Sequence, residues 1–71
     1  MQFECEKLWY GDDNEAYVKL LIFEVEAEGT FVLDITHHDT EELADERLRE
    51  HWHLSALPKM GERMPFEHEG H

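Results

Sequence analysis

Six histidines give this 71-residue chain its greatest capacity for metal chemistry. Zinc is held by three or four ligands in fixed positions, and a helix presents two histidines to one metal at i, i+4 spacing. The histidines occur instead as His37-His38, His51-x-His53 and His68-x-x-His71. We therefore predict no metal site and no cofactor, and a His-based metal-binding protein is the third of three functional alternatives.

Cys5 is the one residue that could supply a thiolate nucleophile. Its neighbours Glu4 and Glu6 would raise the pKa of the thiol and so disfavour the reactive thiolate. A single cysteine also excludes an intramolecular disulfide and a Cys-based zinc site. No Gly-rich phosphate loop or nucleophile elbow is present. We predict that the chain is not an enzyme and that Cys5 is a small core residue.

Carboxylates dominate the polar residues, with 18 Asp and Glu against 6 Lys and Arg and a formal net charge of −12. The charge is uneven, since residues 1–46 carry fourteen acids and two bases whereas residues 47–71 carry four of each. Such a field repels nucleic acid and anionic membranes and steers basic proteins toward the chain. The expected partner is a basic protein surface, with no direct nucleic-acid partner and no membrane partner.

Three predicted strands position these groups. Apolar and polar residues alternate in 2–10, 16–28 and 30–36, and turn residues separate the three segments. An antiparallel meander is the simplest assembly. A helix follows, with Asp39 and Glu42 as a capping box, and Pro58 ends it by residue 57. Its apolar stripe comprises Leu43, Ala44, Leu48 and Trp52.

The predicted fold is therefore one α+β domain, residues 1–57, of β-β-β-α order. The helix packs on one face of the sheet, and residues 58–71 form a flexible C-terminal tail. A five-residue first loop places Tyr10 opposite Ala16, and a three-residue second loop places Phe23 opposite Ile35. Both registers give one apolar sheet face, which comprises Phe3, Cys5, Leu21, Phe23, Val25, Phe31, Leu33 and Ile35.

The outer face of this sheet is the predicted partner-binding surface. Glu24 lies opposite Asp34 there, and like charges in that position reduce stability. A row of carboxylates is also explained by solubility alone. The acidic part of the surface comprises Glu4, Glu6, Glu24, Glu26, Glu28 and Asp34. Its apolar part comprises Leu8, Val18, Leu20 and Ile22.

The apolar part is left exposed in this arrangement because one helix covers only one face. Three explanations stay open: a homodimer interface, a site for another protein, or a surface covered by tail residues. The tail residues that could cover it are Met60, Met64 and Phe66.

These features predict a small acidic inhibitor or modulator that binds a protein. The leading hypothesis is a nucleic-acid mimic that occupies the basic groove of a nucleic-acid-binding protein, such as a defence nuclease complex. In composition the chain is similar to small phage inhibitors that present carboxylates in place of phosphates. The alternative is a non-mimic interaction module, such as an adaptor, an antitoxin-like partner or a homodimeric regulator, that uses the apolar part.

A cytoplasmic location is expected, in the host cytoplasm if the protein is virus-encoded. No apolar run reaches the ~20 residues of a membrane span. The N-terminal residues are not those of a signal peptide.

Overall fold

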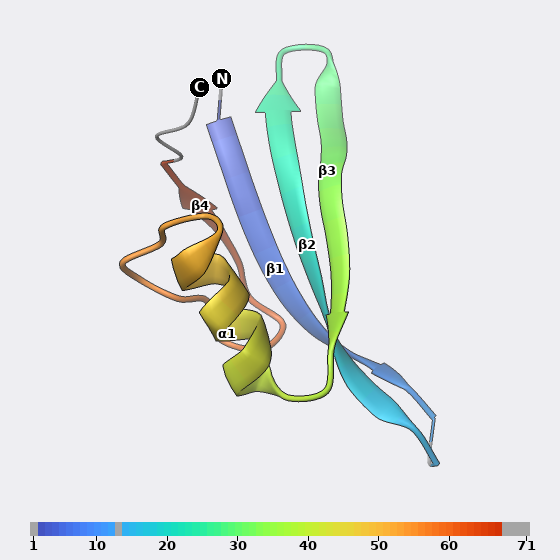
Figure 1. Cartoon of the computed structure of the whole chain (residues 1–71). Helices are drawn as coiled ribbons and strands as arrows, with labels where there is room; N and C mark the ends of the chain where they lie inside the picture. Colours follow the sequence, from blue (N-terminus) through green and yellow to red (C-terminus); the bar gives the residue numbers. More distant parts are fainter. Residues whose placement is uncertain (1, 13, 68–71) are drawn as a thin grey trace.

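Four strands and one helix are present in the computed structural model, which describes residues 2–12 and 14–67. The strands form a single antiparallel sheet in the order β3-β2-β1-β4, and α1 packs on one face of it (Figure 1). The small α+β class is as predicted, but the sheet has one more strand than expected. The elements are β1 (Gln2–Gly11), β2 (Ala16–Glu26), β3 (Gly29–His38), α1 (Glu41–Glu50) and β4 (Arg63–Phe66).

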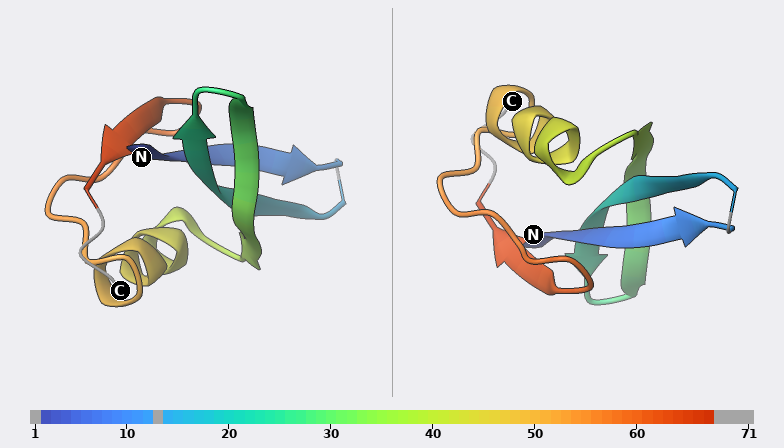
Figure 2. Two further views of the ribbon diagram at one scale, coloured as in Figure 1. Left: turned by 90° about the horizontal axis from the view of Figure 1, so that it is seen from above. Right: turned by 90° about the horizontal axis from the view of Figure 1, so that it is seen from below.

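The additional strand, β4, lies in the segment predicted to be a tail. It pairs with β1, on the side of β1 away from β2 (Figure 2). Met64 and Phe66 pack against the core, whereas Pro65 stands at the sheet edge, where its missing N–H is tolerated. Tail residues 68–71, including His68 and His71, lie outside the described residues.

The register between β1 and β2 differs by one residue from the prediction. Gly11 pairs with Ala16, and Cys5 therefore lies opposite Ile22 instead of Leu21. Gly11 adopts φ 123°, and a Cβ there would stand 2.0 Å from the carbonyl oxygen of Glu15. Only glycine fits this close turn. The shift of one residue exchanges the two faces of β2 relative to β1.

The register between β2 and β3 contains a β-bulge. Glu26 pairs with Gly29, so the turn has two residues, 27–28, and not the predicted three. Farther along, Phe23 pairs with Val32 but Ile22 pairs with Asp34. Leu33 is thus an extra residue in β3, and beyond it Leu21 pairs with Ile35, so odd-numbered residues of the two strands again lie opposite each other, as in the predicted register.

The core lies between α1 and the sheet face that contains Cys5, Leu20 and Ile22. These side chains are fully buried, together with Val18 and the helical residue Leu48. The prediction that Val18, Leu20 and Ile22 form an exposed patch is therefore wrong. Burial of Cys5, Leu48 and Trp52 in this core is confirmed, and Phe23 is buried on the opposite sheet face instead, whereas Phe31, Leu33 and Ile35, also predicted for the core, are exposed.

Helix α1 begins one residue later than predicted. Thr40, and not Asp39, is the N-cap, and its hydroxyl accepts a hydrogen bond from the Leu43 N–H at 3.2 Å. Glu41 and Glu42 occupy the first turn, where they suit the positive end of the helix dipole. Leu43 is 45% exposed, so the apolar stripe consists of Ala44, Leu48 and Trp52. Within the described residues, no helix is long and apolar enough to cross a membrane.

Candidate protein-binding surface

The sheet face opposite α1 carries apolar side chains of β2 and β3 beside the acids Glu4 and Glu6 of β1, and no described helix packs across it. We call it the open face; Val32 and Ile35 from β3 are 52% and 46% exposed there. Phe23 is buried because the Arg63 guanidinium lies over its ring, 4.2 Å from the centroid. A sheet face of this kind is typical of a protein-binding site. The open face comprises Leu21, Phe23, Val25, Val32 and Ile35.

The outer edge of β3 borders the open face and pairs with no strand in the described part of the chain. Phe31 and Leu33 are 49% and 45% exposed, in addition to Val32 and Ile35. Edge strands are usually protected by lysine, by proline, by a β-bulge, by an inward-pointing charge or by being short. β3 has the bulge at Leu33 and the inward-pointing Asp34, but it is ten residues long and contains neither lysine nor proline, so its outer edge is available for pairing on either side of the bulge.

The predicted acidic row is divided between two faces by the observed registers. Glu4 and Glu6 lie on the open-face side of β1, and Glu4 accepts a hydrogen bond from Arg63 Nε at 2.5 Å. Asp34 faces α1 and accepts from Arg47 Nη2 at 3.2 Å. Glu24 lies opposite Phe31. The predicted Glu24–Asp34 pair is therefore wrong, and so is the single acidic face.

Leu8, the fourth residue of the predicted apolar part, is half-buried on the open-face side of β1. Glu26 and Glu28 are exposed at the β2–β3 turn, beside Glu24. Desolvation and, next, the Glu26 carboxylate raise the pKa of Glu24. This concentration of like charge is named the turn cluster: Glu24, Glu26 and Glu28.

A second acidic group lies at the other end of β3. There the end of the strand and α1 enclose a hollow of about 370 Å³, the end hollow. Arg47 is the one Lys or Arg side chain among its lining residues, and it is already bound to Asp34. The acids of the end hollow are Asp39, Glu46 and Glu50.

Lys7 is a buried cation that sequence reasoning missed. Its side chain is 1% exposed, and Nζ donates hydrogen bonds to Glu41 at 2.7 Å and to Asp45 at 2.6 Å. Burial lowers the pKa of Lys7, but the two carboxylates outweigh that effect and the net shift is upward. The sequence did contain an indication of this site. Lys7 is two residues from Cys5 and so lies on the same side of its strand, and Glu41 and Asp45 are spaced i, i+4 and so lie on the same side of the helix.

The described side chains that could act as nucleophiles, bases or metal ligands are either buried or far apart. Burial raises the pKa of the Cys5 thiol to about 11. Desolvation and, next, the Arg47 guanidinium lower the pKa of His38, whose Nε2 lies 2.7 Å from Thr36 Oγ1. In residues 2–12 and 14–67, no three His, Cys, Asp or Glu side chains are grouped as metal ligands.

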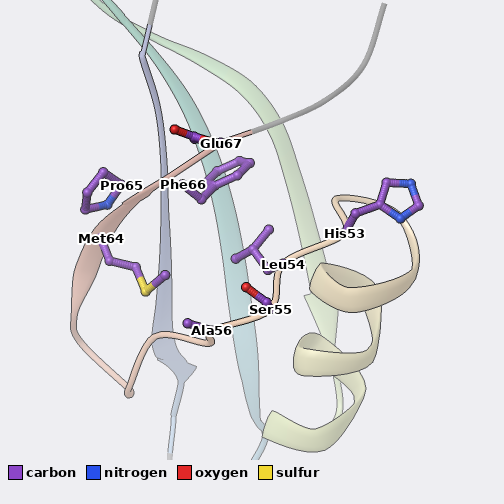
Figure 3. A pocket seen from close by; sticks show the side chains of 8 residues that line it. All are labelled: His53, Leu54, Ser55, Ala56, Met64, Pro65, Phe66 and Glu67. Atoms are coloured by element: carbon purple, nitrogen blue, oxygen red, sulfur yellow. The ribbon is translucent and has the colours of Figure 1, made fainter.

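A hollow of about 490 Å³ lies between the loop of residues 53–56 and β4. Figure 3 shows Leu54 and Phe66 pointing into the space between them, whereas His53 points away. Among the residues that line this hollow, no imidazole faces the Ser55 hydroxyl.

Aromatic side chains cluster on the arm formed by the ends of β1 and β2. The rings of Tyr10 and Tyr17 are 5.5 Å apart, and Tyr17 lies 4.8 Å from the His37 ring. Lys19 Nζ lies 4.7 Å from the centroid of the Tyr10 ring. This cluster extends the open face toward the hairpin tip. Trp9, on the other side of the arm, is 59% exposed.

The described surface thus combines an apolar sheet face, an unpaired strand edge and acids at both ends of that edge. No family model, no curated protein and no solved structure matches this chain. Its function is accordingly inferred from the chemistry of its own surface.

Proposed function

We propose that this chain is a small acidic modulator that binds another protein through the open face and the β3 edge. The observation that carries the proposal is the exposure of four large apolar side chains on one strand, each between 45% and 52% exposed. Scattered apolar residues are ordinary on protein surfaces, but exposed apolar side chains concentrated along one unpaired edge favour an interface. Val32 and Ile35 lie on the open face, Leu33 lies in the bulge, and Phe31 lies on the α1 side of the same edge.

The charge distribution favours a basic partner. Lys7, Arg47 and Arg63 are engaged in ion pairs with acids of the same chain. The charged groups at the surface are therefore mainly carboxylates, in keeping with the formal net charge of −12. Such a field accelerates association with a basic protein, and apolar contact then holds the complex.

A paired substitution on the open face tests the proposal. Val32→Thr with Ile35→Thr removes exposed apolar surface and retains β propensity. The partner recovered from lysate with the wild-type chain would be titrated against each variant by calorimetry. We expect the dissociation constant to rise at least about tenfold, a loss of about 1.4 kcal/mol of binding free energy.

Trp9→Thr is the matched control, because Trp9 is 59% exposed and lies on the side of the arm away from the open face and from the β3 edge. It should leave the dissociation constant unchanged. Equal affinity of the wild-type chain and the Val32/Ile35 variant would reject the proposed surface, and so would equal losses in the variant and the control.

A nucleic-acid mimic is the second candidate, now on the helix and not on the sheet. Glu42, Glu46 and Glu50 are all exposed and follow one another at i, i+4 spacing. A helix places such residues ~6 Å apart along its axis, so they form a regular row of negative charge. Binding by this row would weaken steeply with salt, whereas binding by the open face would not.

Changing the three glutamates together to glutamine separates the two candidates. The mimic predicts that this triple variant loses the partner and that the Val32/Ile35 variant keeps it. Docking through the open face predicts that the Val32/Ile35 variant loses the partner even at high ionic strength, where steering by charge is suppressed.

A further inference from the structure

The outer edge of β3 has the geometry of a template for one more strand. A ten-residue strand extends over roughly 33 Å, and on either side of the bulge at Leu33 alternate residues on its free side present unpaired N–H and C=O groups. These groups bind an extended peptide through main-chain hydrogen bonds, while side-chain pockets on the two faces select its sequence.

Charge varies along this edge in a simple order. The turn cluster lies at the Gly29 end, and the end hollow lies at the His38 end. Between them Phe31, Val32, Leu33 and Ile35 are exposed, with Thr30 and His37 exposed beside them, and the one acid, Asp34, is bound to Arg47. The edge is thus acidic at both ends and apolar in the middle.

We infer that the β3 edge binds an extended segment of the partner protein, with an apolar middle and Lys or Arg at both ends. The inference rests on the proposed function and specifies the chemistry of its partner. A basic side chain at one end of the segment reaches Asp39, Glu46 and Glu50 of the end hollow. The basic residues at the other end meet the turn cluster, so the match of charge holds for either direction of the added strand.

A second copy of this chain fits the edge less well. Antiparallel pairing of two β3 strands would place the turn cluster of one copy beside the end hollow of the other. Parallel pairing would place each acidic group beside its own counterpart. Both arrangements oppose carboxylates at the two ends of the interface, and like charges across strands are destabilising. Complementarity of charge therefore selects a basic segment.

The experiment uses a labelled synthetic peptide of about nine residues, long enough to cover most of β3. Its sequence is KKVTITVKK, and fluorescence anisotropy at low and high salt gives its affinity for the full chain. Two matched peptides serve as controls: EEVTITVEE reverses the charge of the ends, and N-methylation of the central residues blocks main-chain hydrogen bonds. Amide shifts in NMR spectra locate the bound peptide.

We expect the lysine peptide to bind with amide shifts concentrated in residues 29–38. The glutamate peptide should bind at least about tenfold more weakly, and N-methylation should have an effect of similar size. Glu46→Gln with Glu50→Gln should weaken binding of the lysine peptide about fivefold, whereas Glu42→Gln should not.

Equal binding of the lysine and glutamate peptides would overturn the inference, as would full binding of the N-methylated peptide. Sedimentation of the wild-type chain as a dimer that Val32→Thr with Ile35→Thr dissociates would also overturn it, in favour of a second copy. If the lysine peptide fails but this variant still loses its partner, strand addition is wrong and the proposed function stands. If the peptide binds while the variant keeps full partner affinity, the open face is not part of the docking surface and the edge site stands.

Discussion

Lys7 places a positive charge inside the apolar core, where two carboxylates of α1 accept its hydrogen bonds. An unpaired buried charge is costly, so Lys7 restricts the rotation and position of α1 on the sheet. Glu41 and Asp45 are one helical turn apart, and only one side of α1 presents both of them. The buried Lys7 ion pairs therefore fix the position of α1 on the sheet more than they add to the net stability of the fold.

Lys7→Met is expected to lower the free energy of unfolding by about 3 kcal/mol, as measured by urea denaturation. The physical reason is that Asp45, whose side chain is 20% exposed, loses its cation. Adding Asp45→Asn and Glu41→Gln should restore part of the loss. A loss below about 1 kcal/mol would show that the pair behaves like an exposed salt bridge.

His38 gives a prediction for pH dependence. Its pKa in the folded state is lowered from the ordinary value of 6.5, so the unfolded chain takes up the proton more readily. The stability contributed by neutral His38 is present above 6.5 and is lost as the pH falls through that value. We expect His38→Gln to flatten the pH dependence of the free energy of unfolding on the acid side of 6.5.

Urea titrations at a series of pH values measure this slope. His51→Gln, at the exposed C-cap of α1, is the control and should follow the wild-type chain. Parallel profiles for wild type and His38→Gln would contradict the assignment.

Strand β2 explains why the core face could not be read from the sequence. It carries large apolar residues at both odd and even positions. Alternation therefore does not show which face of the strand is buried. Register selects it, and register depends on the φ of Gly11 and on the bulge at Leu33. The two sets are Val18, Leu20 and Ile22 on the core side and Leu21, Phe23 and Val25 on the open face.

The other elements differ in how well their sequences reveal them. The first three strands and α1 have enough residues for a periodic pattern, and all were predicted. β4 has four residues, too few for alternation to be distinguished from irregular chain. The acidic composition predicted a basic partner. The location of the candidate site could not be predicted, because it depends on which face of β2 is turned toward α1.

Two neighbouring leucines test the register directly. Leu20 is fully buried beneath α1, whereas Leu21 is half-buried on the open face. Leu20→Ala should lower the free energy of unfolding by about 3 kcal/mol, and Leu21→Ala by about 1 kcal/mol. Chemical denaturation of the two variants measures both values. The reverse order would restore the predicted register.

At the scale of the molecule, the acidic charge opposes the compact state. Fourteen acids fall within residues 1–46, and folding brings them closer together. Self-repulsion of this kind is screened by salt, whereas the buried Lys7 interactions are screened much less.

Sodium chloride is therefore expected to raise Tm by about 4 °C, corresponding to about 1 kcal/mol for a domain of this size. Calorimetry at increasing salt concentration measures the change. The variant with glutamine at positions 42, 46 and 50 should respond less, because it has less charge to screen. A Tm that falls with salt would mean that favourable surface ion pairs outweigh the repulsion.

Cys5 is the only thiol in the chain, and it is sealed beneath the helix with a pKa raised to about 11. A thiol reagent in solution can therefore react only during the moments when α1 lifts from the sheet or the whole domain opens. The rate of labelling then counts those openings, since no second thiol contributes to the signal. One buried sulfur atom thus makes the opening of the core measurable, as an equilibrium when reclosing outpaces labelling and as a rate when labelling outpaces reclosing.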